Sequence, residues 1–360
     1  MKIITVSDSF KGTLTSKEVG TIVTNHFKNQ NIDASYIPIS DGGEGFLDVI
    51  EYVLKLKKYA IKVFDPMFRE TTSKYIIDEE NKTAYLELAE ASGITKVKDI
   101  VPRTYVASTY GLGQVIKHVI KKHKIKKIVL GIGGSATSDM GVGMLEALGV
   151  EFIDSDGFVI KRMNNMNIAK IRKIDTKLFK KQIKGIEFIT LSDVTNPLLG
   201  ENGSINVFAP QKGAKDQELI IMEKNLKHLY KKLNIDTCYK MPDFPGAGAA
   251  GGVGYCMKYF FNSKVEKGID TILKLVNFEN EVKEADVVIS GEGKFDSQSF
   301  GGKVISGIKK YNPKRLVIIC GISEVEENDV YAIVPKYATT EESLNNPKES
   351  LQKLLCDIKL

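Results

Sequence analysis

The sequence lacks several features that would place it in a familiar class. It has no tryptophan, and it has four cysteines and four histidines among 360 residues. The cysteines are far apart and form no Cys-x-x-Cys pair, which argues against a zinc site and against a disulfide framework. No apolar run is long enough for a membrane span or a signal peptide. We therefore expect a soluble, cytoplasmic protein.

Excess charge and phosphate-loop signatures are also scarce. The net charge is +6, but the lysines are scattered along helical faces, so neither a nucleic-acid surface nor a membrane surface is expected. A mildly positive balance suits small anionic substrates. The sequence contains no Gly-x-x-x-x-Gly-Lys-Ser/Thr motif, and no histidine lies in a predicted strand-end loop, so His-dependent catalysis has little support.

What the chain does have is glycine, 31 residues in all, most of them clustered. The stretch 127–139 predicts a buried strand, a loop with Gly131, Gly133 and Gly134, and then a helix through Met144. One of Ser135, Thr137, Ser138 and Asp139 is expected to cap that helix. A helix start reached by a glycine loop can hold a phosphate, although the same glycines could simply pack a strand against its helix.

Two earlier strand-end loops carry charge. Residues 2–6 predict a strand followed by Asp8 and Lys11, and Thr15-x-x-Glu18 has the spacing of a capping box. A second strand, at 34–39, ends in Ser40-Asp41-Gly42-Gly43-Glu44-Gly45, which has more carboxylates than a turn requires and favours a ligand or Mg²⁺ role. Loops of this kind face the ligand edge of an α/β sheet, but solvated turns would also explain them.

Three later segments repeat this pattern. Asp193 directly follows a predicted strand at 185–191, where a carboxylate can act as a general base or hold a metal. The run 245–254 has no residue larger than valine or proline, so another backbone or a ligand must come close to it. The loop 290–298 mixes Glu292, Lys294 and Asp296 with glycines, a combination suited to phosphate or metal binding.

Other segments keep alternatives open. Residues 61–64, 74–77 and 83–88 predict a run of strands, and Glu87 at the end of this run could be functional or simply exposed. Asp154 lies about 20 residues beyond the central glycines, the spacing of an acid that binds a ribose hydroxyl in dinucleotide-binding folds. The sequence Asp154-Ser155-Asp156-Gly157 also fits a hairpin turn.

Taken together, these motifs resemble the bacterial glycerate kinases of the first type in order and spacing over nearly the whole chain. The segments that carry the resemblance are Asp8-Ser9-Phe10-Lys11-Gly12-Thr13, Ser40-Asp41-Gly42-Gly43-Glu44-Gly45, Gly133-Gly134-Ser135-Ala136-Thr137, Asp193-Val194-Thr195-Asn196-Pro197-Leu198, Pro210-Gln211-Lys212-Gly213-Ala214, Pro245-Gly246-Ala247-Gly248-Ala249-Ala250-Gly251-Gly252, and Gly291-Glu292-Gly293-Lys294-x-Asp296-x-Gln298.

The resemblance implies ATP- and Mg²⁺-dependent phosphorylation of D-glycerate, for most members at the 2-hydroxyl to give 2-phosphoglycerate. It also implies two α/β domains with largely parallel sheets, one inserted into the other, and an active site in the cleft between them. We expect residues 1–65 and 290–360 to form the discontinuous domain and residues 66–289 to form the inserted, flavodoxin-like one.

The resemblance also assigns roles to residues. Asp193 would take the proton of the substrate hydroxyl or bind the metal, and Lys11 and Lys294 would neutralise phosphate or the substrate carboxylate. The predicted groups are Asp193, Lys11 and Lys294 for catalysis; Gly133, Gly134, Ser135, Thr137, Gly248, Gly251 and Gly252 for ATP; Asp8, Ser9, Lys11, Asp41, Glu44 and Asn196 for glycerate; and Asp296, Asp193 and Asp41 for Mg²⁺.

Two other functions compete with this hypothesis. An NAD-dependent oxidoreductase of a small hydroxy acid would use residues 131–136 with Asp154. A non-catalytic sugar-acid-binding protein would bind glycerate without releasing ADP. In each case the expected partners are small molecules, with no nucleic acid and no membrane, and the chain could be a monomer or a homo-oligomer.

Overall fold

A computed structural model describes residues 1–10, 12–40, 42–101, 103–235, 240–295 and 303–359. The chain forms two compact units. Unit 1 contains Met1–Asp41, Tyr52–Leu54 and Gly268–Leu360, and unit 2 contains Gly42–Glu51 and Lys55–Lys267. The sequence placed the boundaries near residues 65 and 290, whereas the compact units change at residues 42, 52, 55 and 268. The assignment of two functional domains, with an active site between them, stays a prediction.

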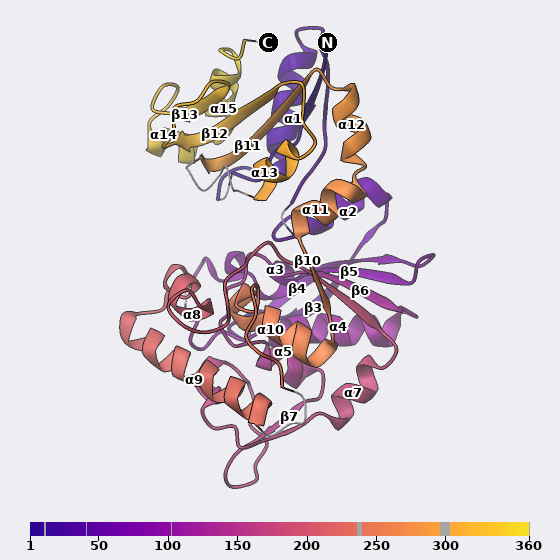
Figure 1. Cartoon of the computed structure of the whole chain (residues 1–360), viewed down its shortest axis with the longest axis vertical. Helices are drawn as coiled ribbons and strands as arrows, with labels where there is room; N and C mark the ends of the chain where they lie inside the picture. The colour runs from indigo at the N-terminus through magenta and orange to yellow at the C-terminus, as the bar shows by residue number, and fades with distance from the viewer. Residues whose placement is uncertain (11, 41, 102, 236–239, 296–302, 360) are drawn as a thin grey trace. The chain divides into compact units, whose positions relative to one another are not determined.

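Unit 1 is built on a parallel sheet with the strand order β13-β12-β11-β1-β2, and Figure 1 labels three of these strands, β11, β12 and β13. Its elements are β1 (Lys2–Thr5), α1 (Ser16–Lys28), β2 (Asp33–Tyr36), α11 (Gly268–Leu275), α12 (Phe278–Glu284), β11 (Val287–Phe295), α13 (Lys303–Lys309), β12 (Leu316–Ser323), β13 (Val330–Val334), α14 (Thr340–Asn345) and α15 (Pro347–Leu355).

Alternate residues of β12 pack into the cores on the two opposite faces of this sheet. Val317 and Ile319 belong to the core that α1 and α15 cover, whereas Ile318 and Cys320 pack with Ile305 of α13. Such alternation is what a strand buried on both faces requires. The start of α1 has the predicted capping box: Glu18 N donates to Thr15 Oγ1 at 3.2 Å, and Thr15 N donates to Glu18 Oε2 at 3.0 Å.

The strand order of unit 1 corrects one expectation. Renumbered along the chain within unit 1, the order is 2-1-3-4-5, which is the flavodoxin-like order. The flavodoxin-like topology therefore lies in the discontinuous unit and not, as expected, in the inserted one. Local strand and helix patterns could not reveal this, because the order depends on Ile3 pairing with Val287.

Unit 2 contains a mixed sheet with the order β10-β9-β6-β5-β4-β3. Its elements are α2 (Phe46–Leu54), which ends in unit 1, β3 (Lys58–Phe64), β4 (Glu70–Asp78), β5 (Thr83–Glu87), α3 (Leu88–Ser92), the short 3₁₀ helix η1 (Ile94–Val97), α4 (Tyr110–Lys122), β6 (Lys127–Gly131), α5 (Val142–Ala147), β7 (Glu151–Ile153), α6 (Asn165–Ile168), β8 (Lys173–Asp175), α7 (Lys177–Ile183), β9 (Glu187–Leu191), α8 (Ser204–Phe208), η2 (Pro210–Lys212), α9 (Asp216–Ile235), α10 (Ala249–Phe261) and β10 (Lys264–Glu266).

The strands β5, β6, β9 and β10 of this sheet are parallel, whereas β3, β4 and β5 form an antiparallel meander. Leu112 and Ile116 of α4 pack with Leu130 of β6 and with Met144 of α5 in one large apolar core. The prediction of an α/β fold with largely parallel sheets is confirmed. Within the described residues, no helix is long and apolar enough to cross a membrane.

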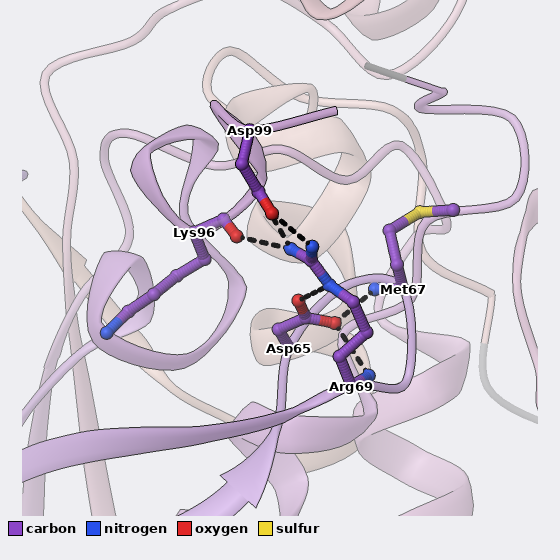
Figure 2. A network of polar contacts seen from close by, with 5 residues as sticks. All are labelled: Asp65, Met67, Arg69, Lys96 and Asp99. Carbon is purple, nitrogen blue, oxygen red and sulfur yellow. Dashed lines mark hydrogen bonds and ion pairs between the residues drawn. The ribbon is translucent and has the colours of Figure 1, made fainter. Parts of the chain in front are cut away.

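A buried carboxylate fixes the turn between β3 and β4 (Figure 2). Asp65, which is 2% exposed, accepts hydrogen bonds from the backbone N–H groups of Met67 and Arg69 at 2.8 and 2.9 Å. The Arg69 guanidinium donates to Asp65 Oδ2 at 2.6 Å and reaches the Lys96 carbonyl and both carboxylate oxygens of Asp99. This network ties the turn to η1.

We expect Asp65→Ala to lower the free energy of unfolding of unit 2 by about 2–3 kcal/mol, because two backbone donors and a guanidinium lose their acceptor. Asp99→Ala is the matched control and should have a much smaller effect, because Asp99 is exposed. Calorimetric unfolding of the full chain measures both variants. Equal effects of the two substitutions would contradict the assignment of the buried carboxylate as the organising group.

Candidate functional site

The predicted loops of unit 2 meet at the carboxyl edge of its parallel strands. Gly131, the last residue of β6, pairs with Leu191, the last residue of β9, so the central glycine loop and Asp193 follow neighbouring strands. A Cβ atom on Gly131 would overlap the carbonyl oxygen of Gly42, and Gly133 N donates to the same oxygen at 3.4 Å. The structure thus brings the loop that carries Glu44 against the central loop.

Asp193 is half-buried directly after β9, where the sequence predicted it. Asn196, three residues further on, serves the loop itself: its carbonyl accepts from Gly246 N at 3.1 Å and from Gly248 N at 3.0 Å. The Asn196 side chain donates to the Asn202 carbonyl at 2.9 Å. These bonds give Asn196 a structural role, and its contact with glycerate stays a prediction.

The small-residue run 245–252 packs against protein backbone. A Cβ atom on Gly251 would overlap the Thr137 carbonyl, and one on Gly248 would overlap the Pro197 carbonyl. Gly252 faces Leu198 and Met140, and its φ of 91° favours glycine. Of the two alternatives left by the sequence, a backbone or a ligand, close backbone packing accounts for Gly248, Gly251 and Gly252. Their assignment to ATP stays a prediction.

Asp139 caps the helix that follows the central loop. Its buried carboxylate accepts from Gly141 N at 3.1 Å and Gly143 N at 3.2 Å, and from the backbone N and Oγ1 of Thr109 at 2.9 and 2.8 Å. Burial raises the pKa of Asp139, and these hydrogen bonds oppose the shift. A cap from this segment was predicted, but a phosphate at the start of α5 was also expected. The carboxylate already takes the donors at the start of α5, and phosphate binding by the glycine loop stays a prediction.

Lys212 donates two hydrogen bonds to the central loop. The sequence patterns did not single it out as a functional residue. Its ammonium group is buried and donates to Ser135 Oγ at 2.8 Å and to the Thr137 carbonyl at 2.9 Å. Burial lowers the pKa of Lys212 to about 7, and the charge of Asp139 opposes this shift. The segment 210–214 is part of the family resemblance, but nothing in its local pattern distinguishes Lys212 from the surface lysines.

Glu87 at the end of β5 is buried, so the exposed alternative for this residue is wrong. Its two carboxylate oxygens accept from Gly45 N and Leu47 N, each at 3.2 Å. Burial raises the pKa of Glu87 to about 8, and the two backbone hydrogen bonds oppose that shift. Glu87 thereby fixes the start of α2, directly after the loop that carries Glu44.

Unit 1 gathers a second set of predicted residues. Asp8 and Ser9 follow β1, Lys294 lies on β11, and all three line one pocket of about 410 Å³. Asp8 N donates to the Gly291 carbonyl at 2.9 Å, which joins the loop to β11. The exposed ammonium of Lys294 forms an ion pair with Glu324 at 2.8 Å.

Three predicted site residues, Lys11, Asp41 and Asp296, lie outside the described residues. Within the residues that the structure describes, no group of three or more Asp, Glu, His or Cys side chains could hold a metal ion. Of the three predicted Mg²⁺ ligands, Asp193 lies within the described residues, and Asp41 and Asp296 lie outside them.

The dinucleotide-binding alternative fails on topology. In that fold the acid ends a strand next to the glycine-loop strand. Here β7 pairs with β8 in a separate small sheet, and the neighbours of β6 are β5 and β9. Asp154 instead stabilises a turn, because its Oδ1 accepts from Asp156 N at 3.0 Å and Phe158 N at 2.9 Å.

Strand-end loops rich in glycine, hydroxyl groups and carboxylates are the places where open α/β sheets bind their ligands, so the two units have the architecture of a ligand-binding α/β protein. Residues 3–359 match the glycerate kinase family. The chain is 33% identical to the glycerate 2-kinase of Escherichia coli (strain K12) over 340 residues, which cover 92% of this chain and 87% of the relative.

The glycerate kinase of Haemophilus influenzae is 35% identical over 327 residues, covering 89% of this chain and 86% of that protein. A crystal structure described as a putative glycerate kinase 2 from Salmonella typhimurium LT2 superposes with a TM-score of 0.77 at 29% identity, covering 99% of this chain and 96% of that one. The chain belongs to the glycerate kinase family, and it is a kinase.

We expect Lys212→Met to loosen the central loop, because Ser135 and the Thr137 carbonyl lose the donor that joins them to η2. Amide hydrogen exchange of a peptide spanning residues 133–140 should become faster by on the order of tenfold. Lys215→Met is the control, since Lys215 is exposed in the same segment. Unchanged exchange in the Lys212 variant would contradict its role in holding the loop.

The raised pKa of Glu87 predicts a pH dependence of stability. Between about pH 4.5 and about pH 8 the folded protein keeps a proton on Glu87 that the unfolded chain has released, so stability falls as pH rises through this window. Glu87→Gln mimics the protonated form. Its stability relative to the wild type should therefore increase from pH 5 to pH 8.

Thermal unfolding of both proteins across this pH range measures the difference, and Glu80→Gln, at an exposed position of the β4–β5 turn, is the control. A constant difference between Glu87→Gln and the wild type would mean that Glu87 is ionised in the fold throughout.

Proposed function

We propose that this kinase transfers the terminal phosphoryl group of ATP to the 2-hydroxyl of D-glycerate and forms 2-phosphoglycerate. The observation that carries the proposal is the family match over residues 3–359, together with a relative named glycerate 2-kinase that aligns with 92% of the chain. The fold supports it, because the predicted loops lie at carboxyl edges of parallel strands, where α/β proteins bind ligands.

In this proposal Asp193 accepts the proton of the glycerate hydroxyl as the bond to phosphorus forms. Its position two residues after β9 places the carboxylate at the carboxyl end of a parallel strand, and a general base must lie within hydrogen-bond reach of the proton that it takes. The neighbouring loop 133–137 is held by Lys212 and by the segment 246–252, and it carries the hydroxyl groups of Ser135 and Thr137 that the sequence assigns to ATP. The Thr137 hydroxyl is buried and makes no hydrogen bond within the described residues.

Magnesium fits the same proposal. Kinases commonly bind Mg²⁺ through one or two carboxylates plus the substrate phosphates, so no cluster of three protein carboxylates is required, and Asp193 would be the Mg²⁺ ligand only if another group takes the proton. The ion would neutralise charge on the phosphate oxygens when bound. The proposed roles of Asp41 and Asp296 as further ligands, and of Lys11 and Lys294 as phosphate or carboxylate partners, rest on the sequence.

Phosphorus-31 NMR of the product made from ATP, Mg²⁺ and D-glycerate tests the reaction directly. We expect ADP and one phosphomonoester signal coupled to the C2 proton. A signal coupled to the C3 protons would mean that the phosphoryl acceptor is the 3-hydroxyl and not the 2-hydroxyl. NADH titration without a change in fluorescence is expected, in keeping with the topology around Asp154.

We expect Asp193→Asn to lower kcat by about 10²–10⁴, because the hydroxyl loses its proton acceptor. Asp154→Asn is the matched control: it changes a turn carboxylate of the same unit and should keep wild-type turnover. A coupled ADP assay on folded variants measures both. Near wild-type turnover of Asp193→Asn would show that Asp193 is not the proton acceptor.

A further inference from the structure

The sheet of unit 1 has a topological switch point between β1 and β11. From β1 the chain passes through α1 to β2 on one side, whereas β11 leads through α13 to β12 and then β13 on the other side. Connections that diverge from two adjacent parallel strands leave a crevice beyond their carboxyl ends, and ligands of open α/β sheets bind there.

The pocket of about 410 Å³ lies at this switch point. Asp8, three residues after β1, and Glu292, on β11, line it. Phe10, Ile333 and Leu344 form an apolar wall. Its volume falls in the range of sites for drug-sized ligands and cofactors, roughly 300–1,000 Å³, and exceeds the needs of a three-carbon acid.

Charge further restricts the ligand. Among the described residues of the lining, Asp8 and Glu292 are carboxylates, and the lysine, Lys294, is paired with Glu324 at 2.8 Å. A glycerate anion or a phosphate placed next to these two carboxylates would face like charge. An uncharged group with hydroxyl donors would instead find acceptors in Asp8 and Glu292, and an aromatic base would find the apolar wall.

We propose that this pocket binds the nucleoside part of ATP, with the base against Phe10, Ile333 and Leu344 and the ribose hydroxyls toward Asp8 and Glu292. The inference rests on the proposed function. It reassigns Asp8, which the sequence had placed with glycerate, to the nucleotide, and it assigns adenosine binding to unit 1.

The test substitutes single residues at the rim of the pocket in the whole chain of 360 residues. Ser343 lines the pocket from α14 and is half-buried, so Ser343→Trp should fill the site without entering the core. Glu341→Trp, on the same helix at an exposed position outside the pocket lining, is the matched control. Leu344→Ala is a second variant, because Leu344 is 60% exposed and its truncation should not affect folding.

We expect Ser343→Trp to weaken binding of unmodified ADP and to raise KM for ATP by on the order of tenfold, with KM for D-glycerate unchanged. Leu344→Ala should weaken nucleotide binding by a smaller factor, and Glu341→Trp should leave it as in the wild type. Isothermal titration calorimetry measures ADP binding without glycerate, so this readout does not depend on turnover.

Wild-type nucleotide binding by both pocket variants would overturn the inference, even if the enzyme phosphorylates glycerate. A rise of KM for glycerate alone would also overturn it and assign the pocket to the acid. If the wild type binds the nucleotide, Ser343→Trp loses it and glycerate is not phosphorylated, then the pocket assignment stands and the proposed function fails. If the wild type does not bind the nucleotide, the inference falls.

Discussion

The pairing of β1 with β11 is the constraint on which unit 1 depends. Ile3, Ile4 and Thr5 lie beside Val287, Val288 and Ile289, so the first strand of the chain completes a sheet whose other half follows more than 280 residues later. Because β1 is also bonded to β2, its removal would separate β2 from the rest of the sheet. Parallel strands need a long crossover, and between β2 and β11 that connection contains the whole of unit 2. The switch point and its pocket exist only because this pairing forms.

Unit 2 uses its glycines mainly to let three loops approach one another. The loop after β6, the segment that begins at Asp193 and the run 245–252 touch through backbone atoms, and side chains at Gly248 or Gly251 would overlap carbonyl oxygens. The result is a rigid strand-end edge on which Asp193 and the Ser135 and Thr137 hydroxyl groups have fixed places. Rigid support is what positioned catalytic groups require.

Local features of this protein were predictable from sequence, and long-range ones were not. The capping box at Thr15 and Glu18 and the strand before the central loop follow from residue patterns of a few positions. The flavodoxin-like order could not be located, because it depends on pairing between the two ends of the chain. The glycine run was ambiguous, since close approach of a backbone and of a ligand select the same residue. Lys212 was missed because burial, which distinguishes it from the other lysines, leaves no trace in its neighbours.

The buried charges of Asp139 and Lys212 are explained by the donors and acceptors they satisfy. Burying an ionised group costs free energy, and an apolar side chain would avoid that cost. An apolar residue at position 139, however, would leave the backbone N–H groups of Thr109, Gly141 and Gly143 without their acceptor in a fully buried place. Each buried donor left unsatisfied costs about 1–3 kcal/mol, so together the three can exceed the cost of one buried carboxylate whose pKa is free to rise. The same reasoning applies to Lys212, which joins Ser135 and Thr137 to η2 and keeps the central loop in one conformation.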